Sequence, residues 1–169
     1  MSEPKSKLKS IIREYLSETE LKETLHDPKL DLGFRFIYPK GKNPQGRPLG
    51  RPFTVVKTKN KSFLDISSPV NISEEHIKIL NSMKKVAKDK FFRKLTKTFL
   101  LKEVFFNFDL QNNRYVIIDN IFLNKNKVIS KNIFYKSIRK VLGCVIFSIL
   151  ELQDFCSGEF DISDLSLAT

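Results

Sequence analysis

The segment of residues 39–52 comes nearest to a recognised chemical motif in this sequence. Gly41 and Gly46 have the spacing of a phosphate-binding loop, but Arg47 and Pro48 stand where that motif needs Lys and Ser or Thr. The segment is also predicted to join two strands, whereas the motif holds its phosphate at a helix N-terminus. We therefore expect a proline-fixed surface loop. Its cations are candidates for contact with an anion or an acidic partner: Lys40, Lys42, Arg47 and Arg51.

The two histidines do not suggest a metal site or a general base. His76 follows two glutamates at a predicted helix start, and a metal would need more converging ligands than one helical turn supplies. His26 lies beside Asp27 and Pro28, in a predicted turn. We therefore expect both to be structural or surface residues.

Three aspartates in or near predicted strands could in principle bind Mg²⁺ or carry out acid–base chemistry: Asp65, Asp109 and Asp119. Asp109 lies opposite the phenylalanine side of its strand, so we expect it to be exposed. Asp119 precedes Asn120 in an otherwise apolar strand and is expected to mark a bulge. Because nothing else converges on them, no catalytic residue, cofactor or metal is predicted.

Residues 84–102 are predicted to form a strongly basic helix. They contain eight Lys or Arg residues and a single acid, Asp89. Such a surface would gain from releasing counterions from phosphates, although lysine favours contact with the backbone over reading of bases. The residues expected to contact nucleic acid or another partner are Lys84, Lys88, Arg93, Lys94 and Lys97.

The charge of the whole chain is +11 and is distributed unevenly. Residues 33–62 hold eight Lys or Arg and no acid, whereas residues 151–169 hold five acids and no Lys or Arg. This asymmetry suggests an acidic partner or a contact between tail and body. Residues 1–156 are predicted to form a single domain and residues 157–169 a flexible acidic tail.

Hydrophobic periodicity predicts the elements that must position these residues. A first helix is expected over residues 4–18, then strands near residues 34–38, 53–58 and 63–66. A long helix is expected to begin at Ser73 and to continue beyond Phe99, and a last helix to begin at Ser130. Two more strands, 104–110 and 114–123, lie between these helices.

The resulting order, α-β-β-β-α-β-β-α, predicts an α+β fold with a five-stranded antiparallel sheet and helices on one face. Phe36, Phe106 and Ile138 are expected in its core. No apolar stretch is long enough to span a membrane, the N-terminus lacks the apolar part of a signal peptide, and two Cys suggest neither a disulfide framework nor zinc. A cytoplasmic location is therefore predicted.

Several short segments resemble a family of small, mostly archaeal proteins of unknown function. They are Leu32-Gly33-Phe34-Arg35-Phe36, Gly50-Arg51-Pro52-Phe53 and Ile72-Ser73-Glu74-Glu75-His76. The resemblance covers about residues 8–152. It implies a fold similar to type III secretion chaperones, with an antiparallel sheet, helices on one side and frequent dimers. Unlike those typically acidic chaperones, this chain is strongly basic.

Two functional hypotheses follow from this sequence. The first is a non-enzymatic binding or chaperone-like module for a protein or peptide, for which a homodimer is expected. The second is a basic nucleic-acid-binding protein directed at phosphates.

Overall fold

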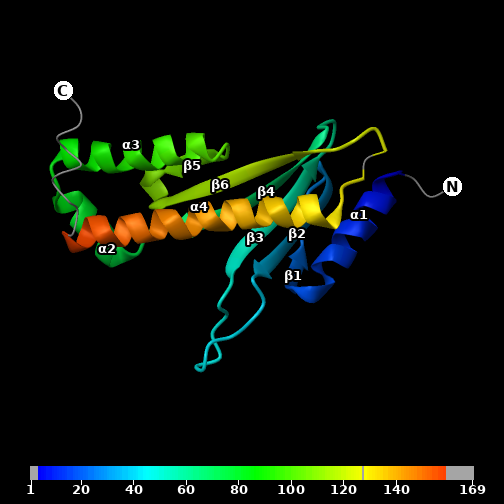
Figure 1. Ribbon diagram of the computed structural model, residues 1–169, viewed down its shortest axis with the longest axis horizontal. Coiled ribbons are helices and arrows are strands. Elements are labelled where there is room, and N and C mark those ends of the chain that lie inside the picture. Colours follow the sequence, from blue (N-terminus) through cyan, green and yellow to red (C-terminus); the bar gives the residue numbers. More distant parts are fainter. Residues whose placement is uncertain (1–3, 127, 159–169) are drawn as a thin grey trace.

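The computed structural model describes residues 4–126 and 128–158, with the side chains of residues 4–6, 22 and 23 excepted. In the described part, a six-stranded antiparallel sheet with the order β1-β2-β3-β4-β6-β5 is combined with four α-helices (Figure 1). The elements are α1 (Pro4–Tyr15), β1 (Glu20–Thr24), β2 (Leu30–Tyr38), β3 (Arg51–Thr58), β4 (Phe63–Asn71), α2 (Glu74–Ser82), α3 (Lys85–Leu101), β5 (Phe105–Asp109), β6 (Arg114–Phe122) and α4 (Lys131–Ser157). Short 3-10 turns follow α1 and β5. The α+β class is thus confirmed.

The prediction of five strands was wrong, because the structure adds β1 at one edge of the sheet. This strand, Glu-Leu-Lys-Glu-Thr, lies in the stretch that looked merely polar. A half-exposed edge strand needs few apolar residues, so its sequence carries little periodicity. β1 is extended because it pairs with β2, and the sequence alone did not indicate this pairing.

The prediction of one long helix after Ser73 was also wrong, because the chain forms two helices there. Ser73 does begin α2, and its side chain accepts a hydrogen bond from the His76 N–H. The helix then stops at Met83, whose ψ of 152° is extended, and α3 begins after Lys84. The apolar spacing continues across this break, which explains why periodicity joined the two helices.

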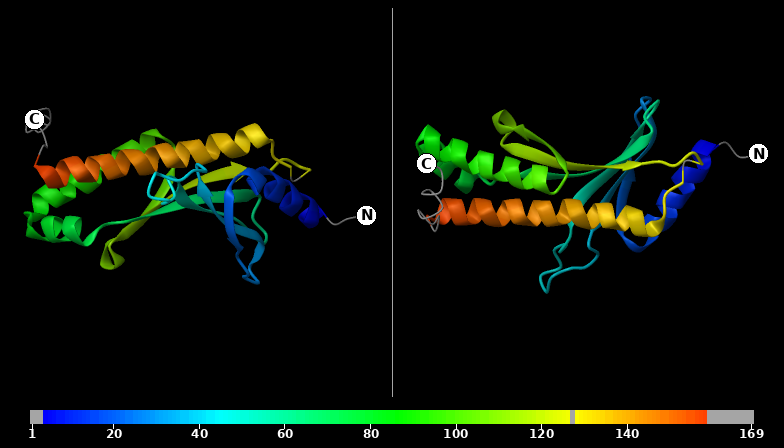
Figure 2. Two further views of the ribbon diagram at one scale, coloured as in Figure 1. Left: turned by 90° about the horizontal axis from the view of Figure 1, so that it is seen from below. Right: turned by 45° about the horizontal axis from the view of Figure 1, so that its top comes forward.

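All four helices lie on one face of the sheet (Figure 2). Along β4 and β6 alternate residues are buried, and they point towards this helical layer. The 27-residue helix α4 crosses the sheet, and α3 lies beside it over β5. Phe91 of α3 stacks on Phe155 of α4, with ring centroids 4.7 Å apart, and so joins the two helices.

A buried polar contact fixes α4 against β6. Asp119 accepts a hydrogen bond from Ser137 Oγ at 2.7 Å and one from Lys140 Nζ at 2.8 Å. The prediction of a bulge at Asp119 was wrong, because β6 pairs with β4 in unbroken register from Arg114 to Phe122. Asp119 instead interrupts the apolar pattern because it bonds to the helix above it.

The core lies between the sheet and the helices. Phe36 and Ile138 are buried there, as predicted. Phe106 packs against this core but is only partly buried, since β5 is an edge strand and no other described strand pairs with its outer side. Phe53 is 1% exposed and stacks on Phe36 with a centroid distance of 5.5 Å.

None of the described helices covers the other face of the sheet. Phe105 and Phe122 point to this open face and are 63% and 73% exposed. At its centre, Asp65 accepts a hydrogen bond from Asn120, and Lys61 lies 3.9 Å away. Burial nevertheless raises the pKa of the Asp65 carboxyl above its usual value, while Lys61 and Asn120 oppose that effect.

We expect Phe53→Ala to destabilise the protein by about 3–5 kcal/mol, because it leaves a cavity under the helices. The matched control is Phe122→Ala on the open face, which should change the stability by no more than about 0.5 kcal/mol. Urea unfolding followed by circular dichroism measures both variants. Equal effects would contradict the assignment of the two faces.

Asp65 and Asp109 should respond to pH with opposite signs. The raised pKa of Asp65 means that its ionised form opposes folding, so Asp65→Asn should stabilise the protein at pH 7 and lose that advantage in acid. The pKa of Asp109 is lowered by hydrogen bonds from Asn112 and then Arg114, so Asp109→Asn should destabilise at pH 7 and become neutral in acid. Urea unfolding at neutral and acidic pH tests both variants, and a shared sign would contradict this interpretation.

Candidate functional site

The loop between β2 and β3, together with Arg51 at the start of β3, is an ordered hairpin that projects from the body. It is named here the basic arm (residues 39–51; Figure 1). The predicted surface loop contains one local pairing, an isolated antiparallel bridge between Lys42 and Pro48. The Asn43 side chain accepts hydrogen bonds from the N–H groups of Gln45 and Arg47, at 3.1 and 2.8 Å. The sequence indicated the prolines and glycines but not this internal bonding.

Glycines permit the two strands of the arm to close. Gly46, with φ of +75°, makes the turn at the tip. At the base, a Cβ on Gly50 would lie 2.2 Å from the Pro39 carbonyl oxygen, so only glycine allows this close approach. The arm is therefore shaped by its sequence before any ligand binds.

The four predicted cations of the arm are all exposed: Lys40, Lys42, Arg47 and Arg51. None of them has an ion-pair partner among the residues that the structure describes. Arg51, at the base, lies close enough to buried Tyr115 to lower the pKa of its phenol. Burial has the larger effect and raises the pKa of Tyr115 to about 12. The arm thus brings these cations together, as the sequence suggested.

The predicted cations of α3 are less uniform. Lys94 forms an ion pair with Glu151 of α4 at 2.8 Å, and Lys88 bonds to the Asn81 side chain at 3.4 Å. Lys84 precedes the helix as its N-cap residue, while Arg93 and Lys97 are exposed. Part of the basic helix is therefore used to join helices to one another.

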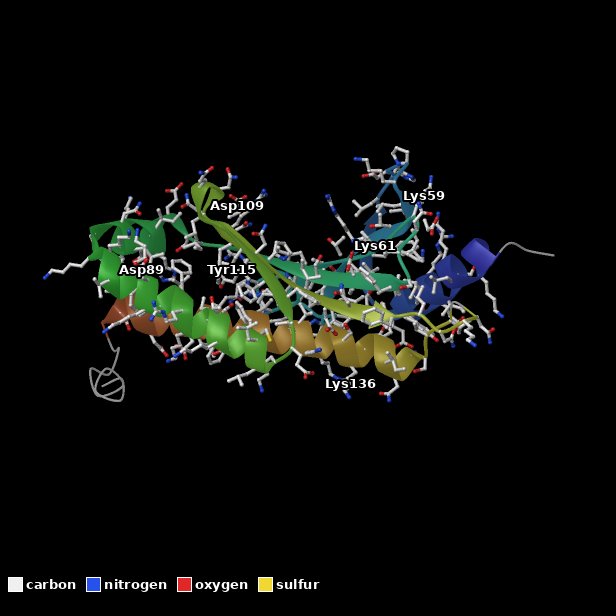
Figure 3. All side chains as sticks on the ribbon, turned by 90° about the horizontal axis from the view of Figure 1, so that it is seen from above. Lys59, Lys61, Asp89, Asp109, Tyr115 and Lys136 are labelled. Carbon is white, nitrogen blue, oxygen red and sulfur yellow. The ribbon has the colours of Figure 1, made fainter. Side chains whose placement is uncertain are left out.

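The structure does not bring the arm and α3 together. In Figure 1 the arm projects below α4, whereas α3 lies above it. Lys136 of α4 points outward from the helical layer in Figure 3. A single small ligand could not contact both predicted groups of cations.

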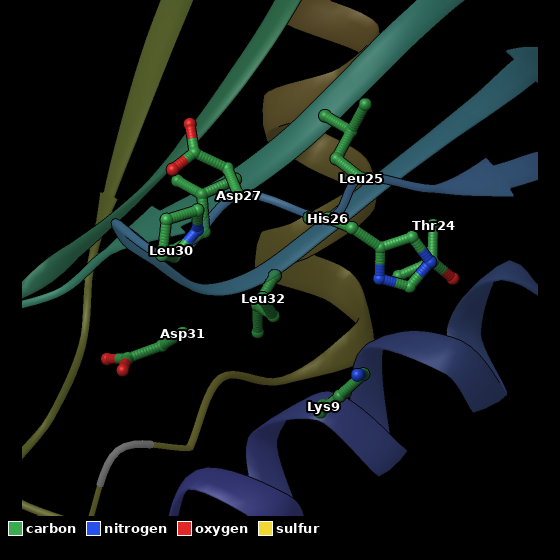
Figure 4. A pocket seen from close by; sticks show the side chains of 10 residues that line it. Lys9, Thr24, Leu25, His26, Asp27, Leu30, Asp31 and Leu32 are labelled. Carbon is green, nitrogen blue, oxygen red and sulfur yellow. The ribbon is translucent and has the colours of Figure 1, made fainter.

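A cavity of about 360 Å³ lies between α1 and the turn that follows β1 (Figure 4). His26, Asp27 and Asp31 line it, but their side chains point in different directions in Figure 4. Asp31 is already paired with buried Lys57 at 2.7 Å, and Asp27 accepts a hydrogen bond from the Lys29 N–H at 2.7 Å. These carboxylates serve the local structure and do not face a common ligand.

The aspartates considered for catalysis lie apart. Asp109 bonds to Arg114 at the end of the β5–β6 hairpin, whereas Lys61, the neighbour of Asp65, lies at the β3–β4 turn (Figure 3). Asp119 is enclosed beneath α4. Within residues 4–126 and 128–158, no three His, Cys, Asp or Glu side chains gather in a way that could hold a metal ion.

The open face and the two edges of the sheet form a surface that sequence reasoning missed. None of the residues that β3 to β6 direct to the open face is a lysine, although the chain is rich in lysine. Next to Phe105, the end of α3 exposes Leu100 and Leu101 at 64% and 83%. Alternation along each strand was a signal for this face, but which strands form the edges depends on the strand order.

In the described part of the chain, no helix is long and apolar enough to cross a membrane. The predicted tail lies outside the described residues, except for Ser157 at the end of α4 and Gly158 after it.

No curated protein matches this chain. A crystal structure of an uncharacterized protein from Methanothermobacter thermautotrophicus has a similar fold, with a TM-score of 0.72 and 20% sequence identity. The similarity covers 87% of this chain and 97% of that one. The model of a family described as "Uncharacterized conserved protein (DUF2299)" matches residues 8–152, which is most of the chain, and this protein therefore belongs to that family.

Proposed function

We propose that this protein is a non-catalytic binding module that accepts an extended segment of a partner protein as an additional strand on β5. The observation that carries the proposal is the contrast between the two edges of the sheet. Lack of catalysis, a cytoplasmic location and a chaperone-like role are parts of the same proposal.

The β1 edge has the features by which proteins prevent unwanted strand pairing. Three of its five residues are charged: Glu20, Lys22 and Glu23. Its register with β2 shifts between Leu21 and Glu23, as at a bulge. Charges and bulges of this kind keep another chain from adding to an edge.

The β5 edge has no register shift, and Asp109 at its end is the one charged residue among its five. Its sequence, Phe-Phe-Asn-Phe-Asp, contains neither Lys nor Pro, and it pairs with β6 in unbroken register. Phe105, Leu100 and Leu101 are exposed beside it. An apolar edge without protection is a site where another strand readily pairs.

The pairing pattern supports free backbone groups on this edge. Pro69 of β4 lies opposite Val116 of β6, and proline has no N–H to donate. In a regular antiparallel ladder Pro69 and Val116 therefore form a pair without mutual hydrogen bonds, and the backbone groups of Pro69 point away from β6. Val116 then bonds to Asn107 of β5, and alternation turns the N–H and C=O groups of Phe106 and Phe108 outward. A partner strand would bond to these groups.

The surroundings of β5 indicate the chemistry of the partner segment. An added strand would extend the row formed by Ile118 and Phe105 on the open face and would contact Leu100 on the helical side. This requires an extended segment with apolar side chains on both faces. Because the exposed side chains beside β5 that would contact the added strand are apolar, such binding should depend little on salt.

We expect Asn107→Lys to weaken this binding strongly, because a lysine at the centre of an edge strand opposes pairing. The matched control is Asn132→Lys, which adds the same charge at an exposed position of α4. The probes are fluorescein-labelled synthetic peptides of strand length, rich in Val and Phe, measured by fluorescence anisotropy at low and high salt. The wild type and the control should bind, and Asn107→Lys should bind at least about tenfold more weakly, the loss of a major contact.

Sedimentation of the same three proteins distinguishes a peptide from a second copy as the occupant. A dimer that Asn107→Lys converts to a monomer supports the β5 edge and makes the second copy its occupant. Equal peptide binding by wild type and Asn107→Lys would overturn the proposal. A wild type that is monomeric and binds no peptide would also overturn it.

A further inference from the structure

We propose that the basic arm inserts into the major groove of duplex DNA and contacts phosphates on both sides of that groove. This goes beyond the proposed function, because the arm joins β2 and β3 whereas the partner-binding edge, β5, lies beyond β4 and β6. The two surfaces can act independently.

The first support is that the arm already has a defined shape. The Asn43 N–H donates to the Arg47 carbonyl at 2.9 Å, and the Leu49 N–H donates to the Gly41 carbonyl at 3.0 Å. The Asn43 side chain adds bonds to the N–H groups of Gln45 and Arg47. Because the hairpin is closed beforehand, little conformational entropy is lost when it binds.

The second support is that the cations occupy both faces of this ribbon. Lys42 and Pro48 form a bridged pair, so their side chains share one face. Arg47 precedes Pro48 in the chain and is therefore placed on the other face. Lys40 lies beyond Gly41, whose φ of +146° interrupts this alternation. A flat anionic surface would leave one of these faces unused, while a groove between two rows of phosphates would contact both.

The third support is that these charges are not neutralised. Residues 33–62 contain no Asp or Glu, and no described carboxylate pairs with the arm. The arm stands away from the body in Figure 1, so a bulky polyanion can approach it. Four cations on one projecting hairpin favour release of counterions from phosphates.

The composition and the two-stranded form of the arm select among nucleic acids. The major groove of B-form DNA admits a two-stranded ribbon. The major groove of duplex RNA is too deep and narrow for it. Residues 39–51 include no aromatic side chain, which single-strand binding by base stacking would require.

The salt dependence of DNA binding tests the proposal. With a fluorescein-labelled mixed-sequence DNA duplex and the full-length protein, four phosphate contacts predict a slope of log K against log salt near −3.6. Affinity should then fall about 150-fold between 50 and 200 mM salt. The double variant Lys42→Gln, Arg47→Gln should reduce this fall to about 12-fold.

The matched control removes the same charge types from α3. Lys85 and Arg93 are exposed there, and the double variant Lys85→Gln, Arg93→Gln should keep the wild-type slope. If both double variants reduce the slope equally, binding reflects overall charge and the proposal fails. It also fails if duplex RNA of the same length, or polyglutamate as a competitor, binds as tightly as the DNA.

A variant without a charge change tests the shape of the arm. Asn43→Ala removes the two side-chain hydrogen bonds at the tip, so it should weaken DNA binding several-fold while the salt slope stays unchanged. Circular dichroism verifies that the body remains folded. Wild-type affinity in this variant would show that a preformed hairpin is not required, which would overturn the groove model.

Discussion

The packing of α4 across β4 and β6 is the contact on which the rest of the structure depends. Phe134, Ile138 and Val145 of this helix are all fully buried. Asp119 and Lys140 fix the helix in register, since a buried carboxylate must keep its hydrogen-bond partners. Tyr115 adds a second polar contact, because its hydroxyl donates to Ser148 Oγ at 2.8 Å. A displacement of α4 along the sheet would break both contacts.

Because this packing places every helix on one side, the opposite side of the sheet is left for other uses. A sheet with one open face normally has a polar, solvated surface there. Here Phe105 and Phe122 are exposed on it, and none of the residues that β3 to β6 direct to it is a lysine. The two edges of this sheet differ, because β1 has features that oppose strand pairing and β5 pairs in unbroken register. We therefore propose that a partner strand joins at the β5 side. The family and the similar crystal structure are both described as uncharacterized, so they neither support nor oppose this assignment.

The two basic segments show that equal charge can serve different physical roles. Several α3 lysines lie on a helix that also packs against its neighbours, and Lys94 pairs with Glu151 of α4. The arm cations form no ion pair with a described acid, and they stand on a hairpin held by Asn43. Counting charges along the sequence identified both segments. The tertiary structure alone shows which cations pair with a carboxylate of another element and which are available to a ligand.

The sequence by itself determined the class of the fold, the caps at Ser73 and Ser130, and the position of the basic loop. These depend on local periodicity, turn residues and charge, which lie within a few residues of one another. It did not determine β1, the division between α2 and α3, or the role of Asp119. The strand β1 forms because it pairs with β2, and Asp119 is explained by a bond to Lys140, 21 residues away. Such features depend on contacts between distant segments, so only the tertiary structure decided them.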